Sequence, residues 1–148
     1  MPSRPTMVDT DNGVQPAVSV TPLIATAPGT WRGFELEDLS LPAGELPPRA
    51  TPLQHVICTV TSPGPITLHW REHGKEQSKV VHRGDMIFRS QQELVDFRWD
   101  QSMDILVLGI GLETLRSVSA DLPGPSNREL VPVFGVPDPL LHRLMLAL

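Results

Sequence analysis

The histidines are the side chains of this sequence that are best suited to hold a metal ion. His69 and His73 are four residues apart, which on a strand is about 13 Å and too far for one ion. If the chain turns at Gly74 and Lys75, His69 and His82 share a face and lie diagonal to each other, as a possible two-ligand site. No third ligand is evident beside this pair, so we expect no bound metal and no other cofactor.

A carboxylate pair is the other candidate for chemistry. Asp96 and Asp104 lie in segments expected to be successive strands, which would allow acid–base work, although a solvated outer face explains both more simply. The sequence contains no Gly-x-Ser-x-Gly turn, no Cys-x-x-Cys pair, no phosphate-binding glycine loop and no tyrosine. We therefore expect no catalytic residues and no enzyme activity.

The composition indicates one ordinary domain. The chain has 148 residues, 40% of them hydrophobic, and a net charge of −5, so it can form a real core and carries no overall basic footprint for nucleic acid. The single cysteine, Cys58, excludes an internal disulfide and fits a reducing compartment. No apolar run approaches the length of a membrane span, and we expect a cytoplasmic protein.

The order of local patterns predicts the architecture. Residues 1–17 are predicted to be a disordered arm, because prolines and polar residues dominate the N-terminal part. Residues 18–111 are predicted to form a small β-barrel, since short β-rich segments alternate with turns at even spacing. The strongest of these segments are 53–61, 66–72, 78–82, 86–89, 93–99 and 103–110.

Residues 112–148 are predicted to be helical and to serve dimerisation. Asp138 and Pro139 suit the start of a helix, and an apolar ridge follows, made of Leu140, Leu141, Leu144, Met145 and Leu148. This helix has a start signal and no stop signal, so we expect the natural polypeptide to continue. The alternative is a genuine C-terminus whose helix packs against the barrel or against a second copy.

Four phrases in this order resemble the N-terminal sensing domain of AraC/XylS-type transcription regulators, over the part from Gly44 to Leu148. They are GELPPRATPLQHVICTV, ITLHWREHGKEQSKVVHRGDMIF, MDILVLGIGLETLRSVSADL and PVFGVPDPLLHRLMLAL. The resemblance implies a mainly β fold, a cupin-like barrel of the jelly-roll type followed by C-terminal helices. It also implies a small-molecule effector in the barrel, a homodimer, and DNA binding only through a separate domain that this chain lacks.

Metal-binding cupins carry two ligand motifs, and this sequence lacks the ligands of both. The histidine pair of the first motif would fall on Arg49 and Thr51, or on Ala50 and Pro52. The histidine of the second motif would fall on Ile87, which offers no lone pair to a metal ion.

We therefore expect a non-catalytic sensor and dimerisation module of a transcription regulator. The alternatives are a stand-alone metal-dependent cupin enzyme (an isomerase or oxygenase) and a domain that only dimerises. For each candidate effector residue, an ordinary core role or solvation competes with ligand contact. These candidates are Arg49, His55, Trp70, Phe88, Phe97 and Trp99.

Overall fold

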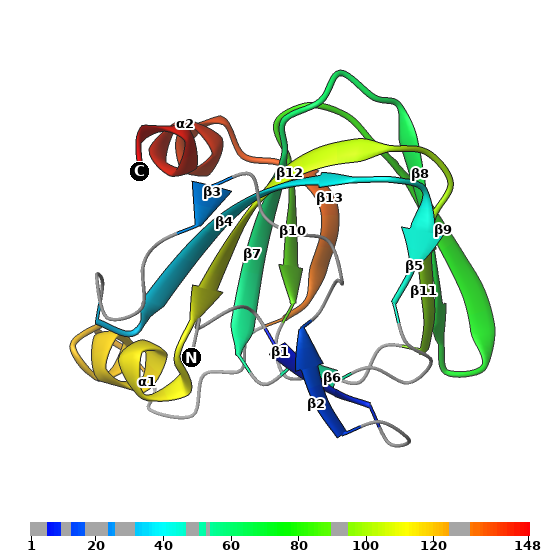
Figure 1. The fold of residues 1–148 in the computed structure, drawn as a ribbon. Helices are drawn as coiled ribbons and strands as arrows, with labels where there is room; N and C mark the ends of the chain where they lie inside the picture. Colours follow the sequence, from blue (N-terminus) through cyan, green and yellow to red (C-terminus); the bar gives the residue numbers. More distant parts are fainter. Residues whose placement is uncertain are drawn as a thin grey trace.

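The computed structural model describes residues 6–9, 13–16, 24–25, 32–46, 51–52, 54–89, 95–124 and 131–148. Two antiparallel sheets form the body of the molecule (Figure 1). The larger sheet has the order β13-β10-β7-β12-β4-β3, and the smaller one, on the right of Figure 1, has the order β5-β11-β8-β9. The prediction of a mainly β fold followed by C-terminal helices is confirmed.

The elements of the two sheets have the following bounds. The six-stranded sheet contains β3 (Ile24–Ala25), β4 (Phe34–Leu41), β7 (His55–Val60), β10 (Asp85–Arg89), β12 (Met103–Ile110) and β13 (Val133–Pro137). The four-stranded sheet contains β5 (Gly44–Glu45), β8 (Ile66–Glu72), β9 (Lys75–Val81) and β11 (Val95–Trp99).

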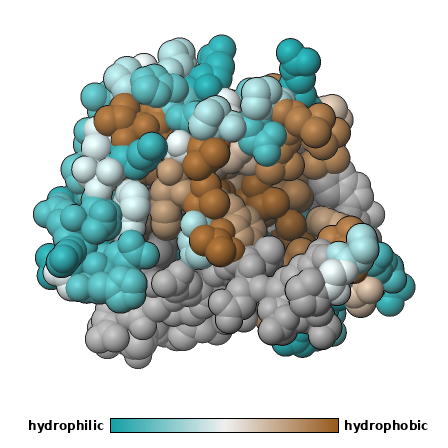
Figure 2. All heavy atoms as spheres, turned by 180° about the vertical axis from the view of Figure 1, so that it is seen from behind, coloured by the Kyte–Doolittle hydropathy of each residue, from teal (hydrophilic) through white to brown (hydrophobic). Residues whose placement is uncertain are grey.

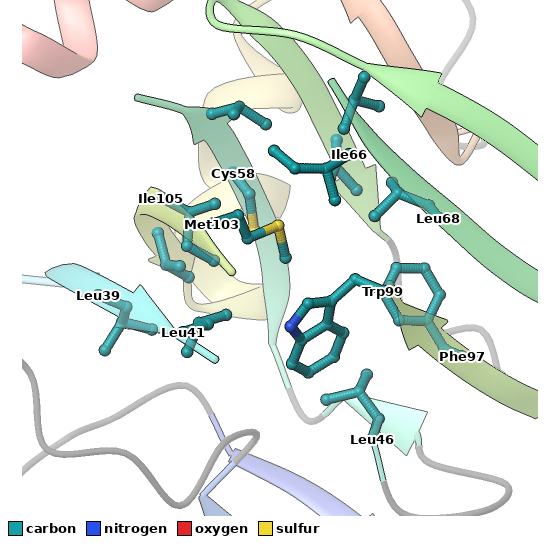
Figure 3. Packing of buried hydrophobic residues seen from close by; sticks show 14 of the residues in the cluster. Leu39, Leu41, Leu46, Cys58, Ile66, Leu68, Phe97, Trp99, Met103 and Ile105 are labelled. Atoms are coloured by element: carbon teal, nitrogen blue, oxygen red, sulfur yellow. The ribbon is translucent and has the colours of Figure 1, made fainter. Parts of the chain in front are cut away.

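The middle of the six-stranded sheet is buried on both faces, because its strands alternate between two separate apolar clusters. We call the face toward the four-stranded sheet the inner face and the opposite one the outer face. The inner cluster is Leu39, Leu41, Leu46, Val56, Cys58, Val60, Ile66, Leu68, Val81, Ile87, Phe97, Trp99, Met103, Ile105 and Val107 (Figure 3). The outer cluster is Met86, Leu108, Ile110 and Met145, with Phe34, Leu36, Ile57, Leu106, Leu115 and Leu141 packed against it.

Two short helices supply side chains to the outer cluster. The first, α1 (Leu112–Ala120), contributes Leu115. The second, α2 (Pro139–Ala147), starts as predicted, since the side chain of Asp138 accepts a hydrogen bond from the Leu141 amide at 3.0 Å. Met145 of α2 is only 2% exposed against the sheet.

The segment between the helices contains a strand that the sequence analysis missed. There β13 pairs with β10 and forms the edge of the six-stranded sheet. Gly135 sits in it at a φ of +68°, and a Cβ at this position would lie 2.7 Å from Val81 of β9. Only glycine allows this close approach of β13 to the four-stranded sheet. The predicted helical segment 112–148 is therefore helix, strand and helix.

The N-terminal part also differs from the predicted disordered arm. Strands β1 (Thr6–Asp9) and β2 (Gly13–Pro16) pair with each other, and β1 pairs with β6 (Thr51–Pro52). Pro16 and Pro52 belong to β2 and β6, the two edge strands of this three-stranded sheet, where a missing N–H is tolerated. Among the described residues, neither helix is long and apolar enough to cross a membrane.

Candidate functional site

Polar side chains collect at one end of the inner face. One cross-strand row of the six-stranded sheet consists of Glu35, Gly109, Val56 and Arg89, on β4, β12, β7 and β10. Gln54 precedes β7 and donates from Nε2 to Glu35 Oε2 at 3.3 Å. This end of an otherwise apolar interior therefore holds a carboxylate, an amide and a guanidinium.

Arg89 is the cation of this group and is almost completely buried, with 8% of its surface exposed. Its Cζ lies 5.5 Å from the centre of the Phe97 ring, a cation–π distance. Within the described part of the chain, Nε and Nη2 have no hydrogen-bond partner. Burial lowers the pKa of Arg89 to about 10, while the neighbouring Cys58 acts to raise it, so the guanidinium is charged at neutral pH.

Two further polar groups share the inner face with Arg89. The Oε1 atom of Gln54 is buried and has no hydrogen-bond partner among the described residues. Glu37 lies next to Glu35 on the inner side of β4 and is 3% exposed. The polar atoms of Arg89 and Gln54 that lack a partner among the described residues are energetically costly in an interior, so they single out this end of the barrel as a candidate binding site.

Aromatic rings extend from Arg89 across the interior. Phe97 is 6.4 Å from Trp99 and 6.1 Å from Phe134, measured between ring centres. Trp70 stacks on Phe134 at 4.3 Å. The indole of Trp99 is held in place because its Nε1 donates to the carbonyl of Pro42 at 2.6 Å. Figure 3 shows Phe97 and Trp99 on neighbouring positions of the core, beside Leu46 and Leu68.

The structure divides the predicted effector residues into two groups. Trp70, Phe97 and Trp99 belong to or pack against the inner cluster, and their contact with an effector stays a prediction. His55 and Phe88 were predicted to contact an effector inside the barrel, and this placement is wrong. Phe88 pairs with Ile57, whose side chain packs in the outer cluster, and His55 alternates onto the same face. Arg49 lies outside the described residues.

On the outer face, His55 and Phe88 form a pair of their own. Their rings are 6.3 Å apart and nearly parallel, at 15°. The Nδ1 atom of His55 is buried without a partner in the described part of the chain. Burial lowers the pKa of His55 from its ordinary value of 6.5, so the neutral imidazole is favoured here.

Sequence reasoning missed the side chains that complete the inner site. Arg89, the last residue of the short strand β10, was overlooked. Along β10, Met86 and Phe88 face one side, and Ile87 and Arg89 face the inner side. Phe134 lies on the missed strand β13. The signal for Arg89 was the period-two pattern of β10, but only the sheet order shows which of the two buried faces is the barrel interior.

The predicted histidine pair is not assembled. The register places His69 opposite Ser78, with the hairpin tip at His73 and Gly74, so His82 is four residues beyond the partner of His69 and not diagonal to it. The Nδ1 atom of His69 lies 3.9 Å from Oε1 of Glu76, and the Nδ1 atom of His82 lies 3.9 Å from Oδ2 of Asp85. Among the described residues, no group of three His, Cys, Asp or Glu side chains is placed to hold a metal ion.

The predicted carboxylate pair is also separated. Asp96 is on β11 of the smaller sheet, and its Oδ2 atom lies 3.4 Å from Nε of Arg71. Asp104, on β12 of the larger sheet, accepts a hydrogen bond from Ser40 at 2.7 Å. The two strands are consecutive in the chain but belong to different sheets.

Comparison with known proteins gives a likeness of fold. No protein-family model and no curated protein matches the sequence. A Cupin 2 conserved barrel domain protein from Salinispora arenicola is similar at a TM-score of 0.43 and 10% identity, over 69% of this chain and 82% of that one. A vicilin from hazelnut (Corylus avellana) is similar at 0.42 and 18%, over 54% of this chain and 23% of the vicilin.

A third similar structure is Streptomyces albus HEPD with 2-hydroxyethylphosphonate and Fe(II) bound, at a TM-score of 0.39 and 17% identity. The match covers 82% of this chain and 32% of HEPD, so this chain spans only about a third of that protein. The two antiparallel sheets of this chain agree with the predicted mainly β fold.

Cys58 provides a test of the interior as described. It is on the inner side of β7, and burial raises the pKa of Cys58 to about 11 from 9.0, against the lowering effect of Arg89. At pH 8 the folded protein then holds roughly a hundredfold less thiolate than an exposed cysteine. We expect slow labelling by Ellman's reagent at pH 8 and rapid labelling after unfolding in guanidinium. Equally fast labelling of the folded protein would contradict the burial of this thiol.

Proposed function

We propose that this chain is a non-catalytic module that binds a small molecule inside its barrel and self-associates, as the sensing domains of AraC/XylS-type transcription regulators do. In this proposal the effector lies on the inner face, between the aromatic rings and the polar end at Arg89. DNA is contacted only by a separate domain, and the protein works in the cytoplasm. The metal-dependent cupin enzyme is the alternative function.

The observation that carries the proposal is the combination of an aromatic interior with unmatched polar atoms. Small-molecule sites are mostly apolar and aromatic, with a few polar groups that orient the ligand. Here Trp70, Phe97 and Trp99 supply the apolar part, and Arg89 and Gln54 supply polar atoms without a described partner. A structural core of this size has no need of such groups.

Neighbouring residues on two strands connect the inner face of the sheet to its outer face. Cys58 and Thr59 are neighbours on β7, and Thr59 Oγ1 is 2.6 Å from His142 Nδ1 of α2. Likewise Met86 and Ile87 are neighbours on β10 and lie in the outer and inner clusters, respectively. We propose that a ligand which favours one arrangement of these strands also biases the position of α2.

Self-association is proposed to use the outward face of α2. Of the predicted dimerisation residues, Met145 is buried within the chain and Leu141 packs against the sheet. Leu140, Leu144 and Leu148 remain 70%, 54% and 59% exposed. Figure 2 shows the apolar surface gathered around a hollow, and also at the upper right, where α2 lies. Gathered apolar surface of this kind favours a protein partner, here a second copy.

The ligand-binding proposal is tested by thermal-shift screening against a library of small metabolites. We expect at least one compound to raise the melting temperature, because a ligand at 100 times its Kd stabilises by about 2.7 kcal/mol. The shift should be lost in Trp70→Leu, which alters the inner face, and kept in Phe88→Leu, which alters the outer face. Each variant is compared with its own ligand-free melting temperature.

Two results would contradict this proposal. The first is a stoichiometric transition metal in the purified protein, which would favour the enzyme alternative. The second is the absence of stabilisation by any compound, which would leave a domain that only dimerises.

The dimer proposal is tested by sedimentation velocity over a concentration series. We expect reversible dimers, and Leu144→Glu should weaken them at least about tenfold, because a charge in an apolar contact stays unpaired. The control is Val118→Glu on α1, at a residue that is 51% exposed, and this variant should dimerise normally. A monomeric wild-type protein at every concentration would refute the proposal.

A further inference from the structure

The buried guanidinium of Arg89 has one edge without a hydrogen-bond partner among the described residues, and we call it the free edge. The atoms of this edge are Nε and Nη2, and each carries an N–H bond that lies in the guanidinium plane, parallel to the other and pointing the same way. A carboxylate offers two oxygens at a matching separation, so this edge can hold it through two hydrogen bonds. The free edge of Arg89 therefore matches the geometry of a carboxylate, and it does more than attract any negative charge.

We propose that Arg89 binds the carboxylate of a small organic acid inside the barrel, with the flat apolar part of that acid against Phe97 and the neighbouring rings. This assignment rests on the proposed function, since it requires a ligand in the interior. It adds the chemical class of that ligand and the residue that selects it.

The surroundings of Arg89 make a purely structural role a poor explanation. No ion pair among the described residues involves it, and Glu35, the acidic member of its cross-strand row, is hydrogen-bonded to Gln54. A buried charge without a partner destabilises a fold, whereas an apolar side chain of similar size would not. A bound anion would supply the missing charge and both missing acceptors.

The rest of the inner face narrows the class to singly charged acids with an apolar body. Glu35 lies on the inner side of β4 in the cross-strand row of Arg89, so a second negative charge on the ligand would meet repulsion from this carboxylate in a low-dielectric interior. Phe97 lies under the guanidinium and leads to Trp99 and Phe134. Flat rings of this kind favour a planar or aromatic ligand body.

Phenylacetate and its neutral isostere phenylacetamide form the matched pair of probes, measured by isothermal titration calorimetry on the full chain. We expect phenylacetate to bind the wild-type protein, and to bind more tightly than phenylacetamide by roughly ten- to a hundredfold, the effect of a charge-assisted bidentate contact. Arg89→Met should remove this preference. Arg98→Met is the control, since Arg98 is exposed and pairs with Glu76 at 2.5 Å, and it should leave the preference unchanged.

The melting temperatures of the ligand-free variants give a second readout. Because Arg89→Met removes an unpartnered buried charge, we expect its melting temperature to equal or exceed that of the wild-type protein. A variant that loses phenylacetate while keeping its stability separates a binding role from a folding role. A marked fall in stability together with lost binding would overturn the proposal in favour of a structural role for Arg89.

The remaining outcomes separate this inference from the proposed function. If phenylacetamide binds as tightly as phenylacetate, or if Arg89→Met still prefers the acid, the carboxylate assignment is wrong while ligand binding in the barrel stands. A second outcome is that neither probe and no carboxylic acid of the metabolite screen binds, while neutral compounds stabilise the protein. In that case too the carboxylate assignment is wrong, while ligand binding in the barrel stands. If no compound of either kind binds, both proposals are wrong.

Discussion

The whole structure depends on a six-stranded sheet whose middle is buried on both faces. Its middle strands must be apolar at almost every position, as in HVICTV and MDILVLGI. One face then forms the interior with the four-stranded sheet, and the other receives Leu115 of α1 and Met145 of α2. Neighbouring residues of one strand therefore lie on opposite faces of the sheet, and the proposed link between a ligand and the helices relies on these neighbours.

Because the sheet is buried on this face, polar side chains at one end of the interior indicate a functional site. An interior that closes the two sheets together gains most from apolar contacts, and the inner cluster largely follows that rule. Arg89 breaks it with a charge that is 8% exposed, and Gln54 breaks it with a buried carbonyl oxygen. Departures from local consistency of this kind concentrate at functional sites.

Much of the fold could be predicted from the sequence, because period-two patterns and turn residues are local signals. The Asp138 start of α2 and the inward faces of Trp70, Phe97 and Trp99 follow from such signals. The inner or outer placement of His55 and Phe88 does not, since both faces of their strands are buried. Strand β13 could not be predicted from local patterns, because it pairs with β10, which lies far from it in the chain.

The central claim is that the free edge of Arg89 receives a carboxylate inside the barrel, and NMR of the arginine Nε–Hε groups observes this edge directly. The Arg89 signal is assigned as the one that is missing from the spectrum of Arg89→Met. On titration with phenylacetate, we predict a large downfield shift of this Hε and slower exchange with water, while the exposed Arg116 stays unchanged. Saturable binding of phenylacetate with an unmoved Arg89 signal would contradict the account.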